Sequence, residues 1–202
     1  MTQAPDGRGE VLRLFVAIVP SSQAVSDLAA ALTPLRRDLD LRWTPSEQWH
    51  VTLLFAEAVP RTTLGPLTDA FGDLTRQVGP LRLGVSGAGA FPRERRARVL
   101  WAGVEVRSPA GGPGPLGGLA ADLHAVAASH GVRTSAAPFR AHLTVARARP
   151  SRDLSSAVAA LAGYRGPSWT PQQAVLVRSR PGAGPGGRAL HEELSRLPLR
   201  TA

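Results

Sequence analysis

Two short segments of the chain share a histidine followed, two residues later, by a threonine. They are HVTLLF, which begins at His50, and HLTVAR, which begins at His142. Side chains alternate between the two faces of a β-strand, so each histidine shares a face with its threonine, Thr52 or Thr144. Because the chain has only five histidines, two in matching strand contexts predict one site built from both strands.

This set of side chains predicts acid and base catalysis on a phosphate ester. Imidazole titrates near neutral pH, so one ring can take a proton from water while the other gives one to the leaving oxygen. The threonine hydroxyls can donate hydrogen bonds to the non-bridging phosphate oxygens. The chemistry needs neither a metal nor a cofactor, and it predicts a bell-shaped dependence of rate on pH.

The elements that must hold these residues follow from hydrophobic periodicity and from prolines and glycines. A helix capped by Ser21 or Ser22 is expected to run toward Leu39, with an interruption at Pro34. Residues 108–118 are expected to form a flexible loop. Besides the motif strands, the pattern predicts strands over 12–19, 41–43, 81–91, 98–106 and 172–180, a last strand ending near Leu199, and helices over 62–78, 116–130 and 153–161.

This order of elements predicts an α+β fold. Each half of the chain contributes one motif strand and two helices. We expect two similar lobes of antiparallel sheet and helices, with the motif strands facing each other across a central cleft. Residues 1–10 are expected to form a disordered tail, and residues 11–200 a single bilobal domain.

Composition favours an anionic partner. The formal net charge is +9 and all 24 basic residues are arginine, a good bidentate ligand of phosphate. A coding sequence rich in G and C would also produce arginine without lysine, so the sign of the charge is the more informative feature. The absence of cysteine excludes disulfides and thiolate metal sites. The apolar run LFVAIV is too short to cross a bilayer, so we expect a cytoplasmic monomer with no membrane partner.

Other side chains are candidates for nucleotide binding. Trp43, Phe91 and Trp101 could stack on a base, although the apolar strand around Trp101 favours core packing. The basic segment PRERRA could follow an RNA backbone or simply be solvated. His124 and His130 are six residues apart on a predicted helix, so they do not share a face as a pair of metal ligands would.

The residues leave other functions open. The chain could be a module that holds RNA ends without turnover, in which case alanine at either motif histidine would leave hydrolysis unchanged. It could be a metallohydrolase, in which case a chelator would abolish hydrolysis. The same site could also act on 2'-5' linked oligonucleotides or on small cyclic nucleotides.

With its flanking segments, the chain resembles the 2H phosphoesterases, in particular the RNA 2',3'-cyclic phosphodiesterases historically called 2'-5' RNA ligases. The resemblance covers residues 13–199. The matching segments are RLFVAIVP, RWTPSEQWHVTLLF, GAFPRERRARVLWAGV, PFRAHLTVAR, VLVRSRPGAGPGG and SRLPL.

The resemblance implies a bilobal fold and metal-independent hydrolysis of RNA 2',3'-cyclic phosphate ends to 2'-phosphomonoesters. His50 and His142 match the catalytic pair, with His142 as the base and His50 as the acid. Thr52, Thr144 and Arg147 match residues that hold phosphate. Phe139, within PFRAH, is a candidate for lining the pocket. In the family the first motif commonly continues with phenylalanine, leucine and glycine, whereas Phe55, Ala56 and Glu57 follow here. His191 stands where the family usually has tyrosine.

Overall fold

The computed structural model describes residues 9–107, 115–135 and 137–200. Most of the expected N-terminal tail, residues 1–8, lies outside the described residues. Glu10, the last residue of the expected tail, forms ion pairs with Arg61 at 3.2 Å and with Arg178 at 2.6 Å. Among the described residues, no helix has the length and apolar character needed to span a membrane.

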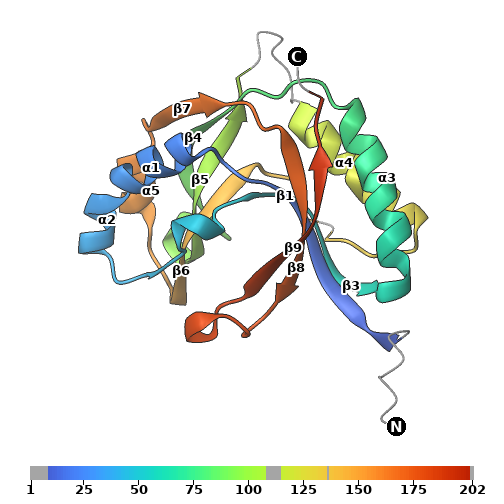
Figure 1. Cartoon of the computed structure of the whole chain (residues 1–202). Coiled ribbons are helices and arrows are strands. Elements are labelled where there is room, and N and C mark those ends of the chain that lie inside the picture. The colour runs from blue at the N-terminus through green and yellow to red at the C-terminus, as the bar shows by residue number, and fades with distance from the viewer. Residues whose placement is uncertain (1–8, 108–114, 136, 201–202) are drawn as a thin grey trace.

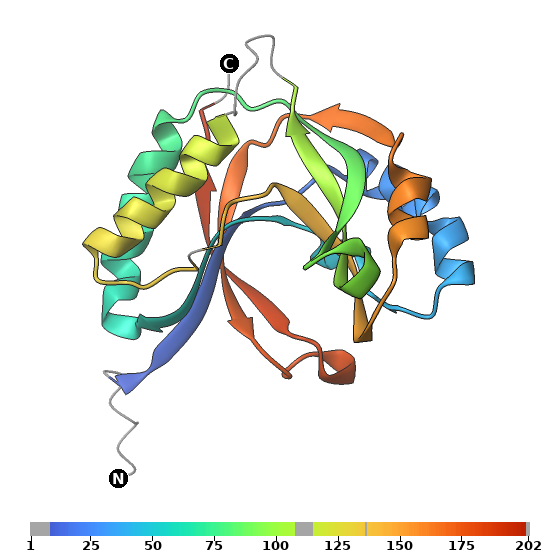
Figure 2. The same ribbon diagram turned by 180° about the vertical axis from the view of Figure 1, so that it is seen from behind.

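The core of the fold is one nine-stranded sheet whose strand pairs are all antiparallel (Figures 1 and 2). Its strand order is β7-β4-β5-β6-β3-β1-β8-β9, and the short strand β2 pairs with β6. The strands are β1 (Val11–Ile18), β2 (Arg42–Trp43), β3 (Val51–Pro60), β4 (Leu83–Phe91), β5 (Ala97–Val106), β6 (His142–Arg152), β7 (Arg165–Trp169), β8 (Gln173–Arg180) and β9 (Leu190–Pro198).

The two motif strands lie next to each other in the middle of this sheet, and they are joined by a single residue pair. Val51 on β3 opposes Leu143 on β6. The sheet therefore divides into two groups of strands that meet at this point. We call β7-β4-β5-β6 and its helices the His142 lobe, and β3-β1-β8-β9 and its helices the His50 lobe. The predicted α+β bilobal architecture is confirmed.

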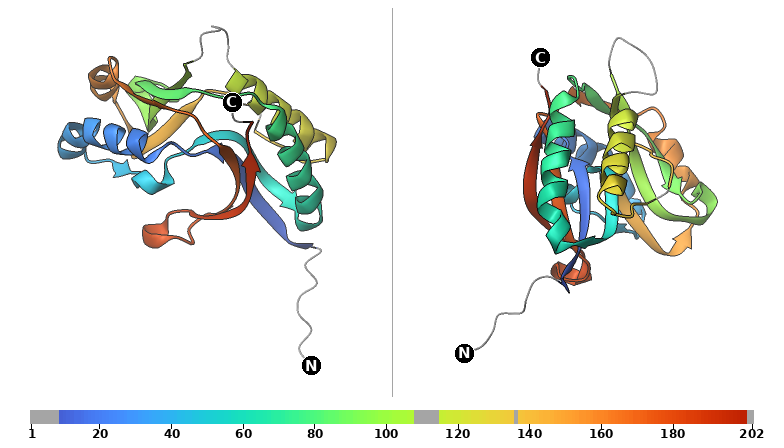
Figure 3. Two further views of the ribbon diagram at one scale, coloured as in Figure 1. Left: turned by 45° about the horizontal axis from the view of Figure 1, so that its top comes forward. Right: turned by 90° about the vertical axis from the view of Figure 1, so that its right-hand side faces the viewer.

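The helices do not cover the lobes in the order of the chain. Helices α1 (Ser22–Ala31) and α5 (Ser155–Leu161) pack on the His142 lobe, and α2 (Thr33–Asp38) packs against α1. Helices α3 (Leu64–Gln77) and α4 (Pro115–Ser129) lie side by side on the His50 lobe (Figure 3). Helix α1 follows β1 of the His50 lobe, and α4 follows β5 of the His142 lobe, so the chain crosses between lobes.

Local signals in the sequence explain most of the element boundaries. The Ser21 side chain caps α1 by accepting a hydrogen bond from the Ala24 backbone N–H at 3.2 Å. Pro34 lies in the first turn of α2, where a missing N–H costs nothing, and the expected long helix is therefore two helices. Both features were predicted.

One strand was not predicted from the sequence. Strand β7 was missed because its sequence, RGPSW, contains glycine and proline. Proline is tolerated there because β7 is the outermost strand of its lobe. Of the loop expected over 108–118, residues 108–114 lie outside the described residues, and Pro115 begins α4, one residue before the helix expected over 116–130.

Candidate active site

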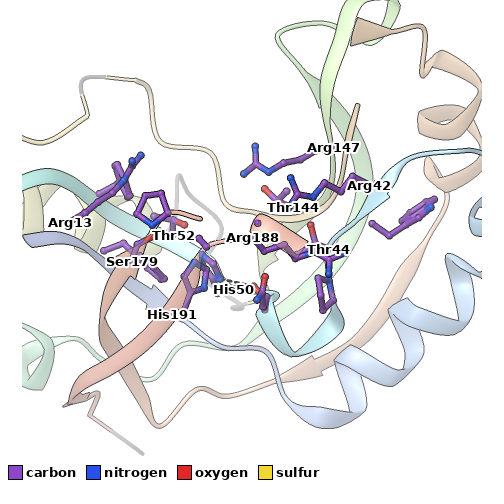
Figure 4. A pocket seen from close by; sticks show the side chains of 18 of the residues that line it. Arg13, Arg42, Thr44, His50, Thr52, Thr144, Arg147, Ser179, Arg188 and His191 are labelled. Carbon is purple, nitrogen blue, oxygen red and sulfur yellow. Dashed lines mark hydrogen bonds between the residues drawn. The ribbon is translucent and has the colours of Figure 1, made fainter. Parts of the chain in front are cut away.

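A cavity of about 400 Å³ lies where the two lobes meet (Figure 4). The five residues expected from the motifs, His50, Thr52, His142, Thr144 and Arg147, all line it. Residues far apart in the sequence are thus brought into one site, and the expected cleft is present.

The strand register explains this convergence. Because Val51 opposes Leu143 in an antiparallel pair, the same register continued by one residue each way sets His50 opposite Thr144 and Thr52 opposite His142. The two central residues are buried, with 0% and 1% exposure, so the flanking side chains point to the other face. The site has an approximate two-fold arrangement around that central pair.

Both imidazoles are held in the same way. His50 Nδ1 lies 2.7 Å from the carbonyl oxygen of Gln48, and His142 Nδ1 lies 2.6 Å from that of Arg140. A carbonyl oxygen can only accept, so each Nδ1 carries the hydrogen and donates it. Each Nε2 is therefore the nitrogen left to exchange a proton with substrate or water.

Aromatic rings pack against the two histidines. Phe15 on β1 stacks on His50, with ring centroids 4.7 Å apart and an interplanar angle of 17°. Phe91 on β4 meets His142 edge-on at 5.1 Å, and Trp101 on β5 lies 6.0 Å from it. These contacts restrict the orientation of each ring.

The lining of the cavity is strongly cationic. The described residues that line it include no aspartate or glutamate and five arginines, Arg13, Arg42, Arg147, Arg149 and Arg188. Arginine is well suited to phosphate because its planar guanidinium donates paired hydrogen bonds. The cavity is therefore built to hold an anion.

Burial and the surrounding positive charge lower the pKa values of the histidines and so favour the neutral rings. Burial is the main reason that the pKa of His50 is lowered from 6.5 to about 4; His191, His142 and Arg147 act in the same direction, and the hydrogen bond to Gln48 acts against them. Burial also lowers the pKa of His142 and of His191. A bound phosphate anion acts in the opposite direction, because it stabilises the charged imidazolium.

Several lining residues were not assigned to the site from the sequence. His191 on β9 meets His50 edge-on at 5.5 Å, and Ser179 faces the cavity from the paired position on β8. Arg149 could have been found from the sequence, because it follows Arg147 by two residues on the same strand. Arg42 could not, since only its pairing with Arg147 brings it there.

Of the aromatic residues singled out as candidates for nucleotide binding, some line the cavity and others do not. Trp43 lines the cavity, whereas Trp101 is only 8% exposed, as expected for core packing. Phe139 does not line the cavity and is 37% exposed, so the proposed site excludes it. Phe91 and Trp101 instead border a second hollow, together with the arginines of the PRERRA segment and Arg140.

The remaining histidines lie outside the cavity. His124 on α4 is hydrogen-bonded to the Thr134 hydroxyl at 2.6 Å, and His130 follows the end of α4. In the described part of the chain, no three His, Cys, Asp or Glu side chains cluster as metal ligands would.

Comparison with known sequences agrees with this geometry. The family model described as LigT like Phosphoesterase matches residues 16–101. An RNA 2',3'-cyclic phosphodiesterase from Archaeoglobus fulgidus is 30% identical over 138 residues, which make up 68% of this chain and 73% of the relative. One from Geobacillus stearothermophilus is 28% identical over 134 residues, but the match spans 66% of this chain and 41% of that relative.

Solved structures share the whole fold. A crystal structure from Thermus thermophilus superposes with a TM-score of 0.74 at 29% identity and covers 94% of this chain and 98% of that chain. E. coli LigT complexed with 3'-AMP gives a TM-score of 0.72 at 25% identity and covers 95% of this chain and 100% of that chain. By sequence and by fold, therefore, this chain belongs to the LigT-like phosphoesterases of the 2H superfamily.

Proposed function

We propose that this chain hydrolyses RNA 2',3'-cyclic phosphate ends to 2'-phosphomonoesters. The observation that carries the proposal is the pair of imidazoles, each held through Nδ1 by a backbone carbonyl, in a cavity lined by arginines. Relatives that bear the name RNA 2',3'-cyclic phosphodiesterase support the choice of substrate.

In the proposed reaction, His142 is the base and His50 is the acid. Nε2 of His142 accepts a proton from water, and the water oxygen attacks phosphorus. The bond from phosphorus to the 3' oxygen breaks, and Nε2 of His50 donates a proton to that oxygen, which leaves a 3'-hydroxyl and a 2'-phosphate. Thr52, Thr144 and Arg147 donate to the non-bridging oxygens, where negative charge accumulates.

The phosphate itself prepares His50 for this role. A ring with a pKa of about 4 is neutral at pH 7 and cannot serve as an acid. Binding of the anionic ester raises that pKa, so His50 gains its proton when substrate is present.

The direct test measures hydrolysis of an RNA with a 2',3'-cyclic end in the presence of a chelator. His50→Ala and His142→Ala should each reduce turnover by about a hundredfold or more, because each removes a general acid or base. His124→Ala is the matched control, since His124 does not line the cavity, and it should retain activity. Unchanged hydrolysis in either motif variant, or loss of wild-type activity in the chelator, would contradict the proposal.

A second experiment tests which histidine donates the proton to the leaving oxygen. A cyclic phosphate with sulfur in place of the 3' oxygen has a leaving group that departs as a thiolate and needs no proton. It should restore turnover to His50→Ala and leave His142→Ala inactive. Rescue of His142→Ala instead would reverse the two roles.

A further inference from the structure

The two halves of the site differ beyond the histidines and threonines, so the approximate two-fold arrangement does not extend to the ends of the cavity. Arg147 is the fifth residue after His142, and the matching position after His50 is Phe55. Phe55 packs against a small apolar cluster formed by Phe15, Ala17, Val175 and Val177. One end of the cavity therefore carries Phe55 where the other carries Arg147. Figure 4 shows Arg42 and Arg147 together on one side of His50 and Arg13 on the other.

Three guanidiniums gather at the arginine end. Arg42 on β2 is the cross-strand partner of Arg147 on β6, and Arg149 follows Arg147 by two residues, which places both on one face of the strand. All three line the central cavity, and all three also line a neighbouring hollow of about 330 Å³. The arginine end thus extends the cavity beyond the histidines.

The positive charge at this end is not compensated within the described residues. Like charges directly opposite on paired strands are destabilising, and no ion pair to a described carboxylate relieves Arg42, Arg147 or Arg149. Asp40 borders the neighbouring hollow, where its backbone carbonyl accepts a hydrogen bond from Arg152 at 2.9 Å. Burial lowers the pKa of Arg147, and the positive charges of Arg149 and Arg42 lower it further.

The arginine at the opposite end has partners. Arg13 lies 3.4 Å from Glu57 and its guanidinium sits 4.8 Å above the Phe55 ring. Arg42 donates one hydrogen bond, to the Gly186 carbonyl at 3.2 Å, and its other N–H groups remain for a ligand. Among the described residues, therefore, Arg13 has a carboxylate partner, whereas Arg42 and Arg149 have none.

We propose that Arg42 and Arg149 form a second phosphate subsite, next to the scissile phosphate held by Arg147 and the motif threonines. The inference rests on the proposed function and narrows its substrate class. The preferred substrate carries a 5'-phosphoryl group on the same nucleoside as the 2',3'-cyclic phosphate, as the terminal nucleotide of an RNA chain does. A free nucleoside 2',3'-cyclic phosphate lacks this second anion.

The kinetic test compares three substrates of one base: adenosine 2',3'-cyclic phosphate, its 5'-phosphorylated form, and the dinucleotide ApA with a 2',3'-cyclic end. A hydrogen-bonded charge pair contributes enough for at least about a tenfold preference in kcat/KM. The double variant Arg42→Gln/Arg149→Gln should reduce the ratio between the 5'-phosphorylated and unphosphorylated substrates to about one. If only the dinucleotide is preferred over adenosine 2',3'-cyclic phosphate, the subsite binds a phosphodiester. If the dinucleotide and the 5'-phosphorylated nucleotide are both preferred, the subsite binds any 5'-phosphoryl group.

Arg13→Gln is the matched control, because it removes one positive charge from the opposite end of the same cavity. It should keep the preference for the 5'-phosphorylated substrate. Equal kcat/KM on the three substrates in the wild type, or a preference that survives in the double variant, would overturn the inference. Loss of the preference in Arg13→Gln as well would also overturn it, because the effect would then come from net charge.

A binding measurement separates this inference from the proposed function. Calorimetry with adenosine 2'-monophosphate and adenosine 2',5'-bisphosphate requires no turnover. The bisphosphate should bind the wild type at least about tenfold more tightly, and this advantage should disappear in the double variant. If the protein binds the bisphosphate more tightly in this way but has no hydrolytic activity, the proposed function is rejected and the subsite is retained. If the monophosphate and the bisphosphate bind with equal affinity, the subsite alone is rejected.

Discussion

His50 and His142 share the same local sequence pattern but have different neighbours. Each donates from Nδ1 to the carbonyl oxygen two residues earlier in the chain. His50 also lies against Phe15 and His191, whereas His142 lies beside Phe91 and Trp101. Identical motifs therefore acquire different electrostatic surroundings, which is what an acid and a base require.

The lowered pKa of His50 predicts how stability depends on pH. Unfolding returns the ring from about 4 to its ordinary value of 6.5, so between these values the unfolded chain binds more protons than the folded one. Stability should therefore fall as pH is lowered from about 6.5 to 4, and His50 alone accounts for about 3 kcal/mol of that loss. Denaturant unfolding at pH 7.5 and 4.5 measures it.

The comparison that tests this prediction is His50→Gln. Its loss of stability between the two pH values should be smaller than that of the wild type, although His142 and His191 still contribute. An equal loss in both proteins would show that burial of His50 is not the cause.

At the scale of elements, the β4–β5 hairpin supplies the aromatic rings of Phe91 and Trp101 that pack against His142. Gly89 on β4 is paired with Trp101 on β5, and the Trp101 ring lies over the glycine. A side chain at Gly89 would overlap that ring. The glycine thus lets Trp101 lie flat against β4 while its ring contacts His142.

Gly89→Ala should therefore destabilise the fold and disturb the site. Overpacking of a buried position costs about 1–3 kcal/mol, which denaturant unfolding would detect, and tryptophan fluorescence should report the displaced ring. Gly65→Ala on α3 is the control, because nothing lies within 4 Å of the added atom. Equal stability of wild type and Gly89→Ala would show that the ring moves aside freely.

The elements that could be predicted from the sequence are those with strong local signals. The Ser21 cap, the break at Pro34 and the alternating motif strands depend on residues close together in the chain. Strand β7 was missed because its glycine and proline are tolerated only at an edge, and a strand's place in the sheet depends on distant partners.

At the scale of the molecule, the site exists only where the lobes meet. His50 and Thr52 come from one lobe and His142 and Thr144 from the other, and β3 and β6 share only the Val51–Leu143 pair. A ligand that bridges the four side chains contacts both lobes at once. Its binding free energy is therefore available to stabilise the junction.

Inorganic phosphate should raise the stability of the whole molecule. At a hundred times its Kd, a ligand that binds only the folded state adds about 2.7 kcal/mol to the free energy of unfolding. Thermal unfolding in phosphate and in chloride at equal ionic strength measures the effect. The double variant Thr52→Val/Thr144→Val removes two hydrogen-bond donors and should reduce the stabilisation by phosphate. Equal stabilisation of the wild type by phosphate and by chloride would contradict a specific phosphate site.

The sequence by itself determined the candidate chemistry, because both histidines and both threonines occur in short segments whose strand character is local. It also favoured an anionic ligand, since net charge is a property of composition. Tertiary structure alone decided that Arg42 joins Arg147, that Phe139 stays outside, and that helices cross between lobes. These outcomes depend on strand register and on packing between distant segments. A slip of one residue in the pairing of Val51 with Leu143 would turn the side chains of the strand that slips, including its histidine, to the opposite face.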